Sequence, residues 1–284
     1  MIRTLRRFWP GVPWVVPTVV LLLALTIYPL VYSVKVSFTG PAGFSLANYA
    51  RLLQDRLFLQ AMAQTLLYTV VALAIEFALG FALALLVDSL GRGRAFVRAG
   101  LLAPMLLPPV VVAVIWRLIY NPQFGVLNGT LRNLGIHTSA LTWASGERGA
   151  LASVILVDVW EWTPFLFLLL SAGLQALPQE PLEAARMDGA SPWQVFRDIV
   201  LPLLKPVMTL SILLRTMDLL RIFDQIFILT QGGPGFATET VSLYIYRTAF
   251  RFFNFGYASA MSFLALGLTI VFARSLMRLM RVSR

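Results

Sequence analysis

EAARMDGASPWQVFRDIVLP, residues 183–202, is a polar, helix-capable stretch lying between long apolar runs. Glu183–Met187 contains strong helix formers. Gly189 offers the left-handed turn that commonly ends a helix. Ser191 and Pro192 are suited to the N-cap and first position of a second helix. The stretch therefore predicts two short helices joined by a glycine turn.

The composition indicates that the bilayer is the solvent for most of the chain. Of its 284 residues, 58% are hydrophobic and 13% are charged, and the mean hydropathy is +0.79. A soluble domain carries about 25% charged residues. The absence of cysteine excludes disulfides, thiolate metal sites and a cysteine nucleophile. The net charge of +10 is spread between apolar runs, so we interpret it as topogenic and expect no nucleic-acid partner.

Six segments approach the length of about 20 mainly apolar residues that a membrane-spanning helix needs. They predict an all-α, polytopic membrane protein with six transmembrane helices. The spans are placed near residues 13–34, 61–87, 99–118, 151–174, 206–229 and 256–276.

The distribution of lysine and arginine orients these spans. Basic residues are more numerous in both terminal segments, in the turn before the third span and in loop 178–205. Because basic loops stay inside, both termini and loop 178–205 are expected in the cytoplasm of a multi-pass cell-membrane (inner-membrane) protein. The segments expected outside are 35–60, 119–150 and 230–255.

The predicted domain organisation has three parts. Residues 1–60 comprise a cytoplasmic tail, the first span and an external segment, and we interpret that span as a retained anchor. Residues 61–277 form a five-helix core that includes loop 178–205. Residues 278–284 form a cytoplasmic tail.

Prolines occur at two informative places in the chain. Pro104, Pro108 and Pro109 predict a kinked third span, serving either packing or a hinge beside a transport route. In loop 178–205, Phe196, Ile199 and Leu201 predict an apolar stripe that lies against the bundle. Pro202 and Pro206 are expected to mark its re-entry into the membrane.

Charges inside spans are costly and by default mark pathways or internal pairs. The fifth span carries four charges of alternating sign at intervals of three. They predict either a self-neutralising ladder of i,i+3 pairs or a wet cavity in which Arg221, Asp224 and the adjacent Gln225 bind a polar solute. Glu76 in the second span has no evident partner, and a protonated carboxyl is the cheaper state for it. The four charges are Arg215, Asp218, Arg221 and Asp224.

The fourth span combines carboxylates and tryptophans. Asp158 and Glu161 alternate with Trp160 and Trp162. Aromatic faces beside carboxylates suit a sugar, whose C–H faces stack on rings while its hydroxyls bond the carboxylates. The same tryptophans also suit an interfacial aromatic belt, so both interpretations stay open.

Three motifs in the sequence belong together. The first is Glu183-Ala184-Ala185, Gly189 and the Ile199-x-Leu201-Pro202 ending. The second motif runs through Leu229-Thr230-x-Gly232-Gly233-Pro234 to Gly256-Tyr257-Ala258, and the third is Trp160-x-Trp162-Thr163-Pro164-Phe165 with Leu174 to Pro178. The first matches the loop signature of ABC-importer permeases without a gap, and together the three resemble the permeases of carbohydrate ABC importers of the maltose type.

This resemblance implies a type I importer permease fold and a machine of several chains. A second, homologous permease would complete a heterodimer, and two ATPase subunits would carry ATP and magnesium. An extracytoplasmic solute-binding protein would deliver a sugar, disaccharide, oligosaccharide or polyol. This chain would bind no cofactor or metal and catalyse no reaction, since it lacks the GxxxxGK[ST] phosphate loop.

The resemblance also implies roles for particular residues. The ATPase would be engaged through Glu183, Ala184, Ala185, Asp188 and Gly189. The solute pathway would involve Asp158, Trp160, Glu161, Trp162, Arg221, Asp224 and Gln225.

Two other classes remain as alternatives. An ion-coupled secondary carrier would explain the intramembrane carboxylates, but it leaves the exposed loop 178–205 without a purpose. An integral-membrane transferase would need a polar catalytic cluster, and the single histidine, His137, lies in an external segment with no adjacent acid.

Overall fold

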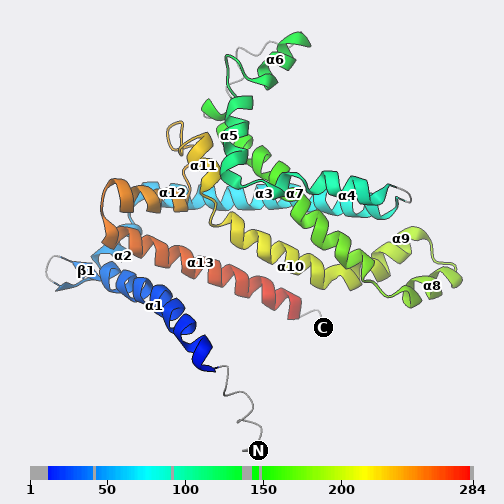
Figure 1. Ribbon diagram of the computed structural model, residues 1–284, viewed down its shortest axis with the longest axis horizontal. Helices are drawn as coiled ribbons and strands as arrows, with labels where there is room; N and C mark the ends of the chain where they lie inside the picture. The colour runs from blue at the N-terminus through cyan, green and yellow to red at the C-terminus, as the bar shows by residue number, and fades with distance from the viewer. Residues whose placement is uncertain (1–11, 41–42, 91–92, 136–142, 147–148, 282–284) are drawn as a thin grey trace, which may run out of the picture. The chain divides into compact units, whose positions relative to one another are not determined.

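The computed structural model describes residues 12–40, 43–90, 93–135, 143–146 and 149–281, and they are mostly helical (Figure 1). His137 and the N-terminal tail through residue 11 lie outside the described residues. The chain forms two compact units. Unit 1 comprises Met1–Asp55 and Ile245–Ala265, and unit 2 comprises Arg56–Tyr244 and Leu266–Arg284.

Unit 1 contains the first span and the start of the last one. It begins with α1 (Val12–Ser37), followed by a two-residue antiparallel pair, β1 (Thr39–Gly40) and β2 (Gly43–Phe44), and by α2 (Ala47–Leu52). Its second stretch starts at the end of α12 (Val241–Tyr246), continues through a π-helical segment, Arg247–Arg251, and includes the first part of α13 (Phe255–Arg281).

The start of α13 is tied to the end of α1 and to α2. A Cβ added at Gly256 would lie 3.2 Å from the Val36 carbonyl oxygen and 3.1 Å from the Asn48 amide nitrogen, so the backbones meet closely there. The Tyr257 hydroxyl donates to Asp55 (2.5 Å), and the Arg51 guanidinium lies over the Tyr257 ring at 4.4 Å. These contacts bring β1, α2 and the first turn of α13 to one end of α1 (Figure 1).

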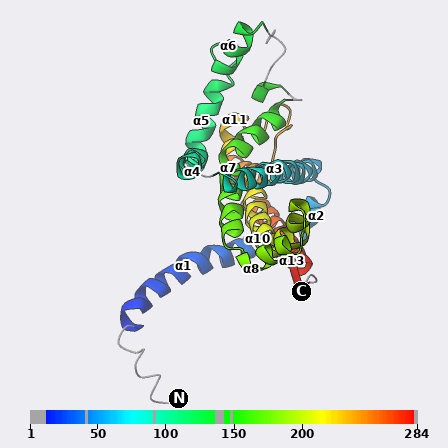
Figure 2. The ribbon, with the colours of Figure 1, turned by 90° about the vertical axis from the view of Figure 1, so that its right-hand side faces the viewer.

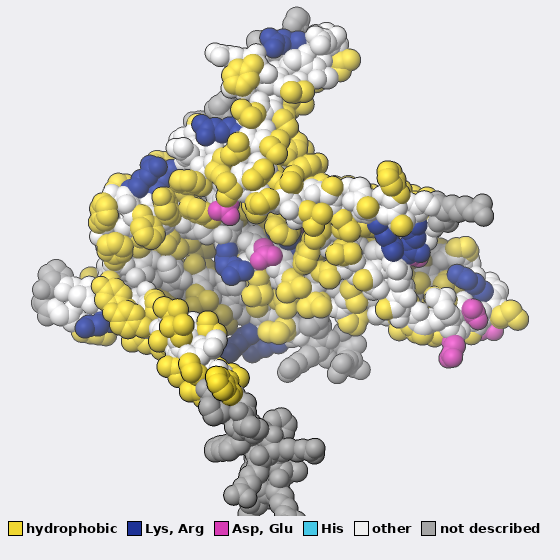
Figure 3. Space-filling view, in the orientation of Figure 1, with side chains coloured by type: hydrophobic (Ala, Val, Ile, Leu, Met, Phe, Trp, Pro, Cys, Tyr) yellow, Lys and Arg dark blue, Asp and Glu magenta, His cyan; other side chains and the backbone are white. Residues whose placement is uncertain are grey.

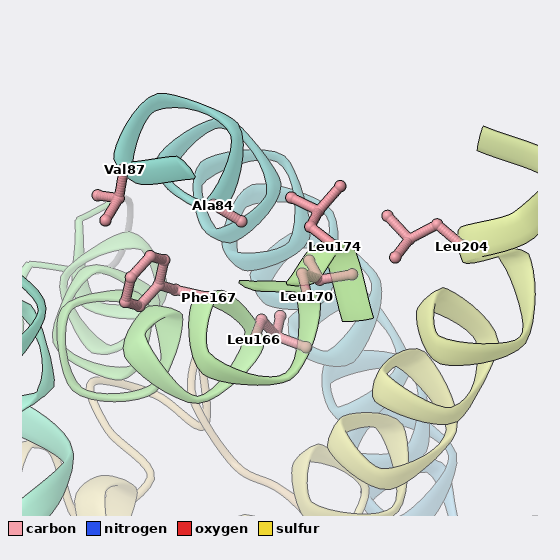
Figure 4. Close-up of a cluster of buried hydrophobic side chains, with 7 residues drawn as sticks. All are labelled: Ala84, Val87, Leu166, Phe167, Leu170, Leu174 and Leu204. Atoms are coloured by element: carbon pink, nitrogen blue, oxygen red, sulfur yellow. The ribbon is translucent and has the colours of Figure 1, made fainter. Parts of the chain in front are cut away.

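Unit 2 is built on three long helices. α3 (Arg56–Asp88), α7 (Ala150–Gln175) and α10 (Leu201–Leu219) meet in a buried apolar cluster. Figure 4 shows its side chains pointing toward one another from all three helices: Ala84, Val87, Leu166, Phe167, Leu170, Leu174 and Leu204.

Small residues let these helices approach each other. A Cβ at Gly80 would lie 2.9 Å from the Leu166 Cβ, and one at Gly173 would lie 2.8 Å from the Leu204 Cδ1. Lipid tails are as apolar as leucine, so close packing and interhelical hydrogen bonds hold such a bundle together.

The third predicted span is interrupted, not merely kinked. α4 (Arg94–Leu102) is followed by a 3₁₀ turn, Pro104–Leu106, and α5 (Pro109–Ile119) has only 11 residues. Leu107 is extended (φ −82°, ψ 140°) because a residue before proline is pushed out of the helical region. α6 (Val126–Asn133) follows α5, and it lies at the opposite end of unit 2 from α8 and α9 (Figures 1 and 2).

The fifth predicted span also differs from its expected limits. α8 (Gln179–Met187) leads to α9 (Pro192–Val195), which continues through a π-helical segment, Phe196–Val200, into α10. The chain is thus helical from Pro192 to Leu219, and Pro202 and Pro206 lie within that path and do not mark a break. Pro202 closely follows the π-helical segment, and such local π adjustments let a membrane helix tolerate the backbone groups that a proline leaves free.

The actual break follows α10. The helix ends at Leu219, and α11 (Asp224–Leu229) starts four residues beyond its C-cap residue. The loop that follows α11 is held by hydroxyl groups: Thr230 and Thr238 share a hydrogen bond of 2.7 Å, and Thr238 donates to the Gly233 carbonyl (2.9 Å). The Val241 amide then donates to Thr65, which fastens the loop to α3.

The described residues contain five helical segments long and apolar enough to cross a membrane: Trp14–Ser37, Arg56–Asp88, Ala150–Gln175, Pro192–Leu219 and Phe255–Ser275. α5 is a shorter apolar helix. The prediction of six spans is compatible with this set if the broken α4–α5 segment supplies the remaining one. The division at residues 60 and 277 stays a prediction.

Candidate functional site

Loop 178–205 has the predicted conformation. α8 ends in a Schellman turn, in which the Gly189 amide bonds to the Arg186 carbonyl and the Ala190 amide to that of Ala185. Gly189 has φ +81°, a conformation that costs a residue with a Cβ. The glycine in the motif is thus required by the turn.

The second helix of the loop starts with a capping box. The Ser191 hydroxyl accepts from the Gln194 amide, and the Gln194 side chain accepts from the Ser191 amide at 2.7 Å. Pro192 occupies the first helical position, as predicted. The half-buried ring of Phe196 packs on Phe81 of α3 (6.1 Å between centroids), which confirms that part of the predicted apolar stripe.

Most of the predicted ATPase-coupling residues of this loop are exposed on the surface of unit 2. Glu183, Ala184, Asp188 and Gly189 are exposed and Ala185 is half-buried, whereas Leu182 anchors α8 inward. Figure 3 shows acidic side chains over this end of unit 2.

Two large apolar side chains also stand out on the loop. Met187 is 88% exposed and Trp193 is 64% exposed. Sequence reasoning did not select them as docking residues, although both lie inside the quoted motif. An exposed surface of two helices with protruding apolar side chains is suited to insertion into a cleft on another protein.

The second site is a buried charge cluster, defined here as Glu76, Asp158 and Arg215. Arg215 Nε donates to Glu76 Oε2 (2.7 Å) and its Nη2 donates to Glu76 Oε1 (2.9 Å) and to Asp158 Oδ2 (2.5 Å). All three side chains are at most 2% exposed. The cluster joins α3, α7 and α10 through charge-assisted bonds, the strongest hydrogen bonds proteins make.

Aromatic and amide side chains extend the cluster. The Arg215 guanidinium lies 5.0 Å from the centre of the Trp162 ring. Gln225 of α11 donates to Glu161 Oε2 (2.6 Å) and accepts a long bond from the Tyr68 hydroxyl (3.4 Å). Four helices therefore meet at one polar layer within unit 2.

The structure brings together only part of the predicted solute pathway. Asp158, Glu161, Trp162 and Gln225 belong to this polar layer. The others lie at the surface of unit 2: Trp160 is 41% exposed, and Arg221 and Asp224 are exposed.

The predicted ladder of i,i+3 pairs is wrong for Arg215. Its partners are on α3 and α7, because a buried guanidinium needs several acceptors at once, which a single neighbour on its own helix does not offer. Arg221 does pair with Asp218 (3.2 Å), and both side chains are solvent-facing at 68% and 47% exposure. Asp224 begins α11 beyond the helix break and is not part of a ladder.

Glu76, for which the sequence offered no partner, accepts two hydrogen bonds from Arg215. The signal for this pair is Glu76 itself, a single charge in the otherwise apolar second predicted span, 61–87. A charge inside a span is costly unless it is paired, so a partner on another span is expected. Tyr68 carried no such signal.

Residues 76–282 match the family of binding-protein-dependent transport system inner membrane components. The chain is 37% identical over 272 residues to the trehalose/maltose transport system permease protein MalF of Thermococcus litoralis, covering 92% of this chain and 90% of the relative. It is 37% identical over 267 residues to the trehalose transport system permease protein SugA of Mycobacterium tuberculosis, covering 91% and 84%.

Solved structures share the fold. A chain of the bacterial alginate ABC transporter, crystallised in complex with an alginate pentasaccharide-bound periplasmic protein, superposes with a TM-score of 0.87 at 22% identity, over 99% of this chain and 98% of that one. A chain of the MetNI methionine ABC transporter gives 0.57 at 17% identity, over 80% and 96%.

The broken spans, the exposed helical loop and these likenesses define an all-α ABC-importer permease fold of type I. The chain belongs to the family of inner-membrane components of binding-protein-dependent transport systems.

Proposed function

We propose that this chain is the permease subunit of an ATP-driven importer for a neutral sugar, most simply a disaccharide such as trehalose or maltose. The observation that carries the proposal is the 37% identity, over nine-tenths of the chain, to two permeases named for these sugars. The family and these relatives give no support to an ion-coupled carrier.

The exposed loop 178–205 supports a separate ATPase as the source of energy. ATP and magnesium are assigned to that partner, two copies of which would serve this chain and a second, homologous permease. The loop passes into α10 without a non-helical residue. At 1.5 Å per residue, the path from Pro192 to Arg215 is about 35 Å long. A helix of that length can carry a displacement of the loop to the buried charge cluster.

The polar layer supports a route for hydroxyl-rich solutes. Asp158 Oδ1 and Glu161 Oε1 are buried and accept no hydrogen bond from the described residues. Carboxylate oxygens of this kind suit sugar hydroxyl donors, and the ring of Trp162 in the same layer suits the C–H face of a pyranose. Trp160, at the surface of unit 2, would offer a second ring to this pathway. Arg221 and Asp224 are assigned to the same pathway.

The proposed ATPase partner also implies on which side of the membrane loop 178–205 lies. Both termini and loop 178–205 are placed in the cytoplasm, and the solute-binding protein would dock on the other side.

The test is uptake of labelled trehalose or maltose into proteoliposomes that contain the membrane complex purified through a tag on this chain. Uptake should require ATP on the loop side and the solute-binding protein on the other. The variant Trp160→Ala should raise the KM for uptake with the complex still assembled. Uptake that persists without ATP under a proton gradient would establish the secondary carrier instead.

A further inference from the structure

Four phenylalanines are exposed within six residues at the start of the last span. The exposed fractions are 61% for Phe250, 70% for Phe252, 71% for Phe253 and 49% for Phe255. The Phe255 ring contacts those of Phe250 and Phe253 at centroid distances of 6.4 and 6.5 Å, so these three rings are contiguous, and Phe252 adjoins Phe253 in the chain. Arg251, in the middle of this turn, is exposed as well.

The backbone of this turn is conformationally strained at Phe253. The Asn254 amide bonds to the Thr248 carbonyl (2.9 Å), and the Asn254 side chain caps α13 by accepting from the Tyr257 amide (3.2 Å). Phe253 lies between the π-helical segment Arg247–Arg251 and α13, and its φ is +53°. Glycine commonly adopts this conformation at helix ends because it lacks a Cβ. A bulky residue there is an outlier. In water, its exposed ring would offset none of that strain.

The position of the turn places these exposed rings close to the ends of two membrane spans. Phe255 is the first residue of the span Phe255–Ser275, and Gly256 packs on the Val36 carbonyl near the end of the span Trp14–Ser37. Phe252 lies three residues from α13, which is at most about 10 Å of extended chain. The headgroup layer on each side of a bilayer is roughly 5–8 Å thick.

We propose that Arg251, Phe252 and Phe253 form a phospholipid site at the membrane interface. The rings lie at the boundary between headgroups and acyl chains, where aromatic side chains concentrate, and the guanidinium binds a lipid phosphate with paired N–H donors. Lipid is the occupant because the turn adjoins the end of α1, whose most apolar stretch has no buried residue in the structure. The site depends on no assignment of which side is cytoplasmic.

The test uses the absence of cysteine in this chain, which makes any introduced cysteine unique in it. Phe253→Cys and, separately, Phe252→Cys are spin-labelled in the assembled transporter in phospholipid nanodiscs. Collision rates with oxygen and with a water-soluble nickel chelate report the depth of the label. Leu25→Cys, 65% exposed on α1, is the matched lipid standard, and the free label is the water standard.

The expected oxygen-to-nickel ratio at both positions lies well above that of the free label and below that at Leu25, and it stays unchanged when the solute-binding protein is added. A ratio equal to that of the free label would overturn the proposal. So would nickel access that is high alone and falls when the binding protein is added, since a protein would then be the occupant. Arg251→Gln should also retain less phospholipid in native mass spectra than Arg251→Lys, and equal retention would remove the phosphate contact.

Discussion

Arg215→Met is the most informative perturbation of the buried charge cluster. Methionine preserves most of the volume of the side chain and removes its charge. It deletes three hydrogen bonds, to both oxygens of Glu76 and to Asp158 Oδ2, and leaves two carboxylates fully buried without a counter-ion. The contact of the guanidinium with Trp162 is lost with them.

The magnitude follows from the burial. Removing one partner from a buried ion pair costs about 3–5 kcal/mol, because the other charge remains in a medium that solvates it poorly. Membrane helices also find polar partners when separated in the bilayer, so we expect the lower end, about 3 kcal/mol. This corresponds to roughly a hundredfold change in the folding equilibrium.

The matched control is Arg221→Met, just beyond the C-terminal end of α10. Arg221 is 68% exposed, its ionic partner is Asp218, and its Nε donates to the Met217 carbonyl (3.0 Å), so the substitution should cost at most about 1 kcal/mol. A second comparison is the triple variant Glu76→Gln, Asp158→Asn, Arg215→Met. It removes all three charges together and should recover much of the loss.

The assay is the yield and thermal unfolding midpoint of the purified complex, followed by tryptophan fluorescence, for all three variants under identical conditions. The reasoning is refuted if Arg215→Met unfolds at the same temperature as Arg221→Met. It is also refuted if the triple variant is less stable than Arg215→Met, because unpaired charge would then not be the source of the cost.

Three other substitutions test the loop and the helix packing. Ser191→Ala removes the capping box and should destabilise the start of α9 by about 1 kcal/mol, seen as faster amide hydrogen exchange over 192–200. Gly80→Ala should cost about 1–3 kcal/mol in thermal stability because its Cβ meets Leu166, whereas Gly267→Ala, with open space around it, should not. Gly189→Arg should abolish co-purification of an ATPase while the isolated chain stays folded, and Gly189→Asn, which tolerates positive φ, should retain it.

Local signals in the sequence predicted the loop well. The Schellman turn at Gly189 and the capping box at Ser191 each depend on residues within six positions, so their geometry follows from residue type alone. The same holds for the existence of the long apolar helices, whose approximate limits agree with α1, α3, α7 and α13.

The positions of the helix breaks were harder to predict. Proline at 104, 108 and 109 indicated a disturbance, yet whether a span bends or separates into two helices depends on which neighbours satisfy the freed carbonyls. Pro202 and Pro206 were expected where the chain re-enters the membrane, and the helix passes through both positions. Pro202 closely follows the π-helical segment, and local π adjustments accommodate the backbone groups that a proline leaves free.

The pairing of the intramembrane charges shows what sequence spacing leaves open. Arg215 and Arg221 each lie three residues before an aspartate, at 218 and 224, and spacing alone makes them equivalent. Their burial separates them. An i,i+3 pair serves Arg221, which also donates to the Met217 carbonyl and whose side chain is otherwise open to solvent. Arg215, at 2% exposure, must find acceptors across helices, and the buried carboxylates of two other spans, Glu76 and Asp158, have the complementary need. For a buried arginine, buried carboxylates on different spans are therefore better partners than charges that alternate along its own span.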